Sequence, residues 1–180
     1  QDSPQGALTG HDAAERLVRE VDCDLVLAAI VGSAGLPATL AAVELGRDVA
    51  LANKETLVAA GSLVVPEAHR TGAKLLPVDS EHAAVWQCLQ AAPGGAAIIP
   101  ALHACPASVR KVILTASGGP FRTWSKSRIN TATRAEALKH PTWTMGEKVT
   151  IDSASLMNKA LELIEAHWLF GIPAEKLEAV

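Results

Sequence analysis

Short apolar runs alternate with longer segments of helical character through the first half of the chain. Strand-like runs occupy residues 25–30, 49–52 and 74–78, and helical patterns lie between them, one ending near Gly46 and the next beginning after Asn53. Strands that alternate with helices in this way are joined by right-handed crossovers and lie parallel in one sheet. The pattern therefore predicts an α/β fold with a Rossmann-like parallel sheet, as in half of a dinucleotide-binding domain.

The apolar stretch 25–46 raises the question of a membrane span. Gly32, Gly35 and Pro37 interrupt it, which suits a buried strand, a turn and a helix better than one continuous apolar helix. The same turn lacks the GxGxxG spacing of a dinucleotide-binding loop. It indicates close packing of strand and helix, and a phosphate cradle only weakly.

Charge and cysteine content narrow the class of partner. A formal net charge of -3 and an aromatic content of 3% predict no binding of nucleic acid or of an anionic membrane. Cys23, Cys88 and Cys105 lie far apart and form no CxxC pair. We therefore expect no disulfide framework and no zinc site, and a reducing, cytoplasmic location. A charged-then-apolar leader is not seen, so no secretory signal is expected.

Polar residues directly follow the third strand-like run, at the edge where open parallel sheets bind ligands. On an extended backbone, Asp79 and Glu81 would point to the same side, with Ser80 between them. Two carboxylates held together favour a cation, and Mg²⁺ or Mn²⁺ takes oxygen ligands of this kind. Alternatively, Asp79 or Ser80 caps a helix that starts at about His82, with Glu81 favourable in its first turn. These residues alone leave both interpretations open.

A polar stripe marks a helical segment near the C-terminal end. Ser155, Asn158, Lys159 and Glu162 recur at i, i+3, i+4 and i+7, which predicts one shared face. The rest of the segment is largely apolar. Such a stripe faces water or, less commonly, a ligand.

The middle of the chain is less regular. Residues 109–116 predict a strand that leads into the tetrapeptide Ser-Gly-Gly-Pro at 117–120. Its glycines permit backbone amides to converge on an anion, although such a tetrapeptide is more often a plain turn. Residues 121–144 are polar and loop-like, with one short helix expected near 133–139.

Four motifs occur in the order and at roughly the spacing of one enzyme family. They are LANKE at 51–55, PVDSEH at 77–82, SGGPFR at 117–122 and the block 140–170 that contains TWTMGEK and MNKALE. Together they resemble the 1-deoxy-D-xylulose 5-phosphate reductoisomerase family, and four motifs in register are far more specific than any one. The resemblance implies an NADPH- and divalent-metal-dependent enzyme that isomerises and reduces 1-deoxy-D-xylulose 5-phosphate to 2-C-methyl-D-erythritol 4-phosphate. That reaction belongs to the non-mevalonate route of isoprenoid biosynthesis.

The resemblance also implies a division into domains. Residues 1–76 resemble the C-terminal part of an NADPH-binding Rossmann-like domain, and residues 77–180 resemble an incomplete catalytic domain of α/β (α+β) type. We expect an internal fragment, because the match begins after the family's glycine-rich pyrophosphate turn and stops before its next strand and helical domain. A homodimer is implied for the full-length protein.

The resemblance assigns three kinds of site. The ligands of a divalent metal ion (Mg²⁺, Mn²⁺ or Co²⁺) are Asp79, Glu81 and Glu162. The residues that bind the sugar phosphate substrate or act in catalysis are Lys54, Ser80, Glu81, Ser117, His140, Trp143, Ser153, Asn158, Lys159 and Glu162. Of these, Ser117, Ser153, Asn158 and Lys159 hold the phosphate. The residues that contact NADPH are Asn53, Glu55, Met145 and Gly146. Thr142 and Ala160 stand where the family often has Asn and Gly.

Two other functions are weighed against this one. A strand ending in Ala-Asn-Lys also occurs in homoserine dehydrogenase-like oxidoreductases, but these do not account for DSEH or MNKALE. The second alternative is that the chain is an inactive fragment that only binds metal. Without the resemblance, His140 reads as a loop histidine, Trp143 and Met145 as core or rim residues, and Lys54 and Glu55 as a solvated pair.

Overall fold

The N-terminal half of the chain is built on a parallel sheet, as seen in a computed structural model that describes residues 7–94 and 98–180. Strands β1 (Leu25–Ala28), β2 (Asp48–Leu51) and β3 (Leu75–Pro77) pair in the order β1-β2-β3, and both pairs are parallel. The predicted α/β fold with a parallel sheet is confirmed. β1 and β3 are shorter than the apolar runs 25–30 and 74–78, because pairing with β2 ends before the runs do.

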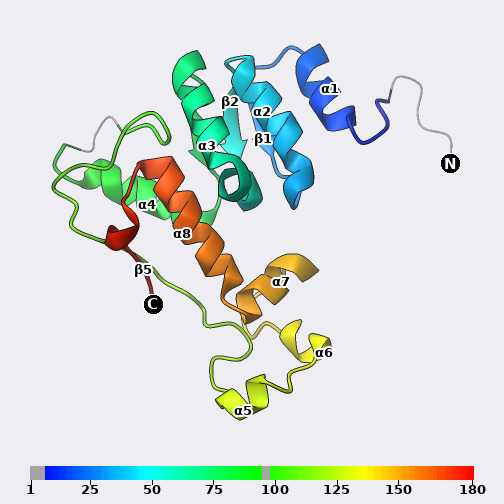
Figure 1. Ribbon diagram of the computed structural model, residues 1–180, viewed down its shortest axis with the longest axis vertical. Helices are drawn as coiled ribbons and strands as arrows, with labels where there is room; N and C mark the ends of the chain where they lie inside the picture. Colours follow the sequence, from blue (N-terminus) through cyan, green and yellow to red (C-terminus); the bar gives the residue numbers. More distant parts are fainter. Residues whose placement is uncertain (1–6, 95–97) are drawn as a thin grey trace.

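Helices α1 (Ala13–Glu20), α2 (Leu36–Glu44) and α3 (Lys54–Thr71) accompany this sheet (Figure 1). The stretch 25–46 forms β1, the short 3₁₀ turn η1 (Ser33–Gly35) and α2, and no described helix has the length and hydrophobicity needed to cross a bilayer. Small and branched apolar side chains with no exposed surface fill the core of this half: Ala41, Ala42, Val43, Val49, Leu51, Leu57, Val64, Ala68 and Leu75.

Asn53 joins β2 to α3. Its side-chain oxygen accepts hydrogen bonds from the backbone N–H of Thr56 at 2.8 Å and from the Thr56 hydroxyl at 2.7 Å, which caps the helix. Its amide nitrogen donates to the carbonyls of Ile30 and Gly32 in the glycine turn. Gly32 has a φ of 78°, a backbone angle that favours glycine. The start of α3, and with it Lys54, is therefore fixed relative to β1.

The C-terminal half is organised around helix α8 (Met157–Phe170), which crosses the middle of the molecule (Figure 1). It packs against α3 and α4 (Ser80–Ala91), and a second, two-stranded parallel sheet pairs β4 (Val112–Leu114) with β5 (Leu177–Ala179). The helix predicted from about His82 begins two residues earlier, at Ser80. The strand predicted over 109–116 is limited to the three residues of β4 that pair with β5.

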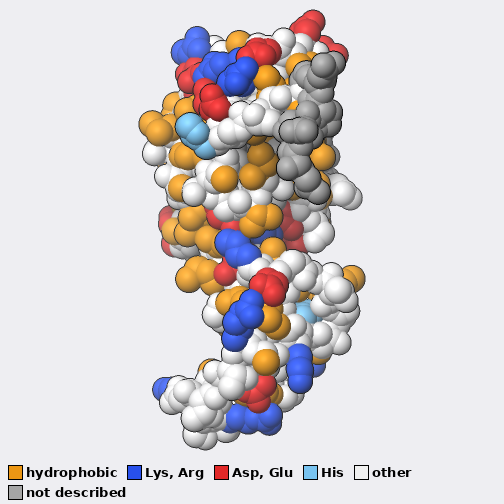
Figure 2. Space-filling view, turned by 90° about the vertical axis from the view of Figure 1, so that its right-hand side faces the viewer, with side chains coloured by type: hydrophobic (Ala, Val, Ile, Leu, Met, Phe, Trp, Pro, Cys, Tyr) orange, Lys and Arg blue, Asp and Glu red, His pale blue; other side chains and the backbone are white. Residues whose placement is uncertain are grey.

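Residues between β4 and α8 form a lobe at one end of the molecule. It carries the short helices α5 (Lys126–Ile129) and α6 (Arg134–Ala137) and leads to α7 (Glu147–Ala154). Figure 2 shows its outer part as a narrow projection with Lys and Arg side chains on the surface. α6 matches the short helix predicted near 133–139 and begins with a capping box at Thr133. α5 was not predicted.

A sharp break separates α7 from α8. Leu156 has φ 61° and ψ 9°, which is left-handed backbone, so α8 starts only at Met157. The prediction that Ser155 shares a helix face with Asn158, Lys159 and Glu162 is therefore wrong. Ser155 ends α7, where its hydroxyl donates to the carbonyl of Ile151 at 3.1 Å. A left-handed leucine has no sequence signal of the kind that glycine gives.

Candidate active site

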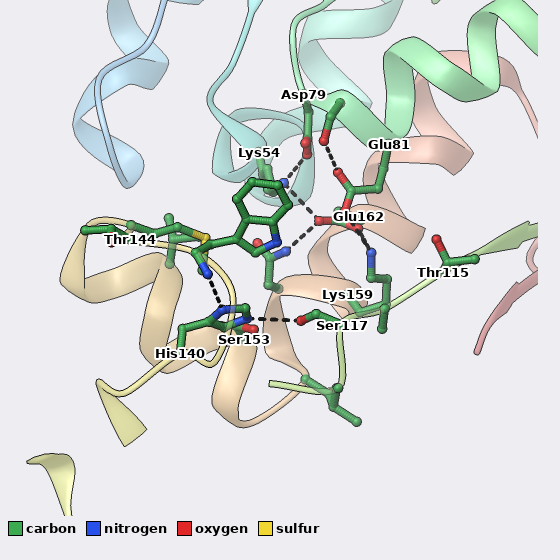
Figure 3. A pocket seen from close by; sticks show the side chains of 18 residues that line it. Lys54, Asp79, Glu81, Thr115, Ser117, His140, Thr144, Ser153, Lys159 and Glu162 are labelled. Atoms are coloured by element: carbon green, nitrogen blue, oxygen red, sulfur yellow. Dashed lines mark hydrogen bonds and ion pairs between the residues drawn. The ribbon is translucent and has the colours of Figure 1, made fainter. Parts of the chain in front are cut away.

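A cavity of about 710 Å³ opens between α4, α7, α8 and the loop after β4 (Figure 3). Most of the predicted site residues line it: Lys54, Asp79, Ser80, Glu81, Ser117, His140, Trp143, Met145, Ser153, Asn158, Lys159 and Glu162. Residues outside the predicted site residues also line it: Thr115, Ala116, Gly118, Thr144, Val149 and Leu156. The cavity therefore gathers side chains from five separate segments of the chain.

Three carboxylates meet in this cavity. Asp79 precedes α4, Glu81 lies in the first turn of α4, and Glu162 lies in α8, with one oxygen of each within 4.8 Å of the others. The expectation that extended backbone places Asp79 and Glu81 on one side is wrong, because Glu81 is helical. The capping alternative also fails in part, since Asp79 stands at the N-cap position but its side chain makes no capping hydrogen bond. An all-oxygen set of this size fits a divalent cation such as Mg²⁺ or Mn²⁺.

Two lysines balance these carboxylates (Figure 3). The ammonium group of Lys54 contacts Asp79 and lies 3.1 Å from Oε1 of Glu162. The ammonium group of Lys159 lies 2.5 Å from Oε2 of Glu162 and 3.2 Å from Oε1 of Glu81. Glu162 is fully buried, and it accepts a further hydrogen bond from the amide of Asn158 at 2.5 Å. Each metal-ligand candidate is thus oriented by at least one cation.

Burial and neighbouring charges shift the pKa values of Lys54 and Asp79 in opposite directions. Burial lowers the pKa of Lys54, but the negative charges of Asp79 and Glu162 outweigh it, so its pKa is raised. Burial raises the pKa of Asp79, but the imidazole of His82, 3.4 Å away, and the charge of Lys54 hold it well below its usual range. Near neutral pH, Asp79 is therefore ionised, as a metal ligand must be. Lys54 carries its positive charge beside it.

Of the predicted phosphate-binding residues, Ser117 and Ser153 lie away from Asp79 in the cavity (Figure 3), whereas Asn158 and Lys159 contact Glu162. The hydroxyl of Ser117 lies 3.1 Å from Nε2 of His140 and accepts a hydrogen bond from the backbone N–H of Gly119 at 3.3 Å. A Cβ atom at Gly119 would lie 2.6 Å from the carbonyl oxygen of Ser153. The loop therefore approaches the end of α7 so closely that only glycine fits there.

Ser153 lies in the last turn of α7 and not at a helix N-terminus. The nearest helix N-terminus is that of α8, at Met157, after the break at Leu156. The ammonium group of Lys159, a predicted phosphate ligand, forms ion pairs with Glu81 and Glu162. The pocket still offers hydroxyl, amide and ammonium donors to an anion.

The segment with His140, Trp143 and Met145 forms one wall of the cavity. His140 accepts hydrogen bonds at Nδ1 from the backbone N–H groups of Thr142, at 3.2 Å, and Trp143, at 2.9 Å. The same imidazole reaches Ser117 through Nε2. The imidazole of His140 therefore connects its own loop to the loop that carries Ser117. The Trp143 side chain stays 64% exposed.

Three of the four predicted cofactor contacts do not line the main cavity. Asn53 and Glu55 line a neighbouring cavity of about 70 Å³, together with Lys54 and Lys148. Lys148 bridges Glu55 at 2.6 Å and Asp152 at 2.5 Å. Gly146 stands at the N-cap position of α7 and lines neither cavity, whereas Met145 faces the main one.

Two buried polar residues behind Asp79 were not found from the sequence. His82 and Glu165 have no exposed surface. Burial lowers the pKa of His82, but Asp79 and Glu165 outweigh it, so its pKa is raised. Burial raises the pKa of Glu165 to about 7, against the charge of His82. Only the packing of α4 on α8 brings these two together, although the i, i+3 spacing from Glu162 to Glu165 placed Glu165 near the polar stripe.

Comparisons with known proteins agree on one family. A family model described as the 1-deoxy-D-xylulose 5-phosphate reductoisomerase C-terminal domain matches residues 75–170, and one described as 1-deoxy-D-xylulose 5-phosphate reductoisomerase matches residues 1–61. The reductoisomerase of Symbiobacterium thermophilum is 54% identical over 171 residues, covering 95% of this chain and 41% of the relative. That of Gloeobacter violaceus is 54% identical over 161 residues, covering 89% and 38%.

Solved structures give the same result. A DOX-P reductoisomerase crystallised with NADPH, fosmidomycin and magnesium matches with a TM-score of 0.81 and 41% identity, over 94% of this chain and 41% of that one. The Zymomonas mobilis reductoisomerase in complex with NADPH matches with a TM-score of 0.76 and 46% identity, over 94% and 40%. The chain spans about two fifths of the length of the curated relatives it matches.

Proposed function

Because the chain belongs to the 1-deoxy-D-xylulose 5-phosphate reductoisomerase family, we propose that it forms the metal- and substrate-binding part of that enzyme. The enzyme isomerises and reduces 1-deoxy-D-xylulose 5-phosphate with NADPH, in non-mevalonate isoprenoid biosynthesis. One observation carries the proposal: a single cavity holds three carboxylates, two lysines and the donors of a phosphate pocket. Homoserine dehydrogenase-like chemistry gives no reason for such a pocket, and none of the named relatives supports it.

Asp79, Glu81 and Glu162 would hold the divalent cation. When bound, the cation supplies Lewis acidity toward substrate oxygen atoms and stabilises negative charge that develops on them. The complexes of relatives with magnesium support this assignment. Lys54, beside Asp79 and Glu162, adds a fixed positive charge at the same place. Ser80, whose hydroxyl donates to Glu81 at 2.5 Å, is proposed to orient that ligand and to contact substrate.

Ser117, Ser153, Asn158 and Lys159 would bind the substrate phosphate. Hydroxyl, amide and ammonium groups are strong donors to a dianion, and the α8 N-terminus adds favourable backbone N–H groups. We further propose that the segment with His140, Trp143 and Met145 closes over the bound substrate. Binding energy from the phosphate would then help to exclude water from the reacting carbons.

Asn53, Glu55, Met145 and Gly146 are proposed as NADPH contacts, supported by relatives crystallised with that cofactor. The division into residues 1–76 and 77–180 also stays a proposal; it falls inside β3 (Leu75–Pro77). We also propose a homodimer for the full-length protein and a cytoplasmic location, as expected from the sequence.

The proposal is tested by calorimetric titration of Mn²⁺ into the metal-free chain, with and without 1-deoxy-D-xylulose 5-phosphate. We expect one Mn²⁺ per chain, bound more tightly with the substrate. Glu81→Ala should abolish binding, whereas Glu175→Ala, at an exposed carboxylate of η2 (Ala174–Lys176), should leave it unchanged. A folded sample that binds no Mn²⁺, with or without substrate, would contradict the proposal.

A further inference from the structure

A buried polar cluster lies directly behind the candidate metal ligands. It consists of His82 on α4 and Glu165 on α8, both without exposed surface. Nδ1 of His82 lies 3.4 Å from Oδ2 of Asp79 and 3.4 Å from Oε2 of Glu165. Among the described residues, Nδ1 of His82 and both carboxylate oxygens of Glu165 have no hydrogen-bond partner. Burial of polar atoms without hydrogen-bond partners costs free energy, so their presence here requires an explanation.

The orientation of the His82 ring follows from one hydrogen bond. Nε2 lies 2.9 Å from the backbone carbonyl oxygen of Glu162. A carbonyl oxygen only accepts, so Nε2 carries the hydrogen and donates it. This bond ties α4 to α8 at the level of Glu162, itself a candidate ligand. It also turns Nδ1 toward Asp79 and Glu165.

Nδ1 of His82 then has a carboxylate on each side. An Nδ1–H group, donated to Asp79, would be stabilised by the negative charge of Glu165, and a shift of a few tenths of an ångström would bring the 3.4 Å separations into hydrogen-bonding range. The resulting chain of contacts runs from Glu165 through His82 to Asp79. Second-layer contacts of this kind orient metal ligands and raise metal affinity.

We propose that Glu165 is a positioning residue that acts through His82 to orient the carboxylate of Asp79 for metal binding. The inference rests on the metal site proposed above. It explains why a carboxylate stands fully buried one turn beyond Glu162, where an apolar side chain would pack at lower cost. It also gives the His82–Glu162 bond a role, because that bond sets the spacing between the ligands on α4 and the ligand on α8.

Two substitutions at Glu165 separate charge from packing. Glu165→Gln keeps the shape and loses the negative charge, whereas Glu165→Asp keeps the charge and loses one methylene. Positioning through His82 predicts that Mn²⁺ affinity falls about tenfold or more in Glu165→Gln, the usual effect of losing such a contact, and falls less in Glu165→Asp. A packing role predicts the reverse order. Glu175→Gln is the matched control at an exposed carboxylate and should leave the affinity unchanged.

A double-mutant cycle tests whether Glu165 acts through His82. His82→Gln should weaken Mn²⁺ binding at least tenfold, and adding Glu165→Gln to it should weaken binding no further. Affinity is measured by calorimetry, and the symmetry of the bound ion by electron paramagnetic resonance. Circular dichroism establishes that each variant is folded.

The outcomes separate this inference from the proposed function. A folded parent chain that binds no Mn²⁺ contradicts the metal site itself and, with it, the inference. A parent that binds Mn²⁺ while His82→Gln binds it equally well overturns the inference alone, whether or not the Glu165 variants fold. Additive losses in the cycle overturn it too. Two Mn²⁺ per chain would overturn it as well, because Asp79, His82 and Glu165, whose ligand atoms also lie within 4.8 Å of one another, would then bind a metal ion themselves.

Discussion

The ammonium group of Lys159 lies between two carboxylates that are also candidate metal ligands, Glu81 and Glu162. A metal ion would compete with it for the same oxygens. A phosphate held by Ser153 and Asn158 would be attracted to it. The Lys159 side chain would thus oppose binding of the metal ion and favour binding of the phosphate.

Replacing Lys159 by methionine should therefore have opposite effects on two ligands. Lys159→Met should bind Mn²⁺ more tightly without substrate, because the ammonium no longer holds the oxygens. The substrate should bind about tenfold more weakly or worse, since a hydrogen bond to a charged group contributes about 1.5–3 kcal/mol. Calorimetry of both ligands, with exposed Lys126→Met as the control, measures this. Parallel changes in both affinities would contradict it.

The buried pair His82 and Glu165 makes stability depend on pH. The pKa of Glu165 is raised to about 7 by burial, so the stability it contributes is complete below about pH 4.5 and is lost as the pH rises through about 7. The pKa of His82 is raised too, and its contribution is lost in the same direction at higher pH.

The metal-free chain should accordingly unfold at a lower urea concentration at pH 8 than at pH 5.5. Glu165→Gln should flatten this dependence, and Glu175→Gln should not. Urea unfolding followed by circular dichroism at the two pH values provides the measurement. A midpoint that rises with pH in the parent chain would show that the pair is not coupled as described.

The sequence motifs identified the carboxylates that are proposed to bind a ligand, but not the buried residues that lie beside them. Asp79, Glu81 and Glu162 are carboxylates in distinctive motifs, and they do meet. His82 and Glu165 could not be placed, because their proximity arises only when α4 packs on α8. Local spacing does not encode a contact between two helices.

At the level of elements, the junction between α7 and α8 shapes the cavity. The left-handed backbone of Leu156 turns the chain, so that Ser153 and Asn158 face the same space from different helices. Helical periodicity alone would have continued one helix through this point. The alternation of strands and helices in the first half could be predicted from the sequence, because each of those elements begins and ends at residues typical of helix or strand termini.

Leu156→Gly should be at least as stable as the parent, because glycine removes a backbone strain of about 1–2 kcal/mol against an entropic cost of about 0.5–1 kcal/mol. Leu156→Val should be clearly less stable, since a β-branched residue fits this conformation poorly. Urea unfolding of the three proteins gives the order. A valine variant as stable as the glycine variant would argue that the backbone here is ordinary.

Gly61 lets α3 and α8 approach each other. A Cβ atom at this position would overlap the indole of Trp168, so Gly61→Ala should destabilise the chain by roughly 1–3 kcal/mol despite the better helix propensity of alanine. The exposed neighbour Ser62 is the control: Ser62→Ala should be neutral or slightly stabilising. A Gly61→Ala variant of parental stability in urea would show that the helices can separate without cost.

At the level of the whole molecule, the candidate metal ligands connect two parts of the chain that are distant in sequence. Asp79 and Glu81 follow the first sheet, whereas Glu162 belongs to the long helix that also packs against α3. A cation held by all three would therefore join the C-terminal part of the chain to the N-terminal sheet.

Metal binding should thus stabilise the fold as a whole. At about 100 times its Kd, Mn²⁺ should add about 2.7 kcal/mol to the free energy of unfolding, and a chelator should remove that gain. Thermal unfolding with and without Mn²⁺ checks this, with Glu81→Ala as the variant that should not respond. An unchanged Tm for the parent chain at saturating Mn²⁺ would contradict a site shared between α4 and α8.

Helix α8 carries Asn158, Lys159 and Glu162 near one end and the buried Leu169 and Phe170 at the other. On the proposed function, selection for ligand binding and selection for folding therefore act on the same fourteen residues, and a substitution there affects both. In the loops 115–118 and 140–145, by contrast, Thr115, Ala116 and Thr144 line the cavity with no assigned ligand and no place in the buried core. Substitutions should accordingly be tolerated in those loops more often than in the helix. We expect this both among natural relatives and among variants selected in the laboratory to accept other phosphorylated ligands.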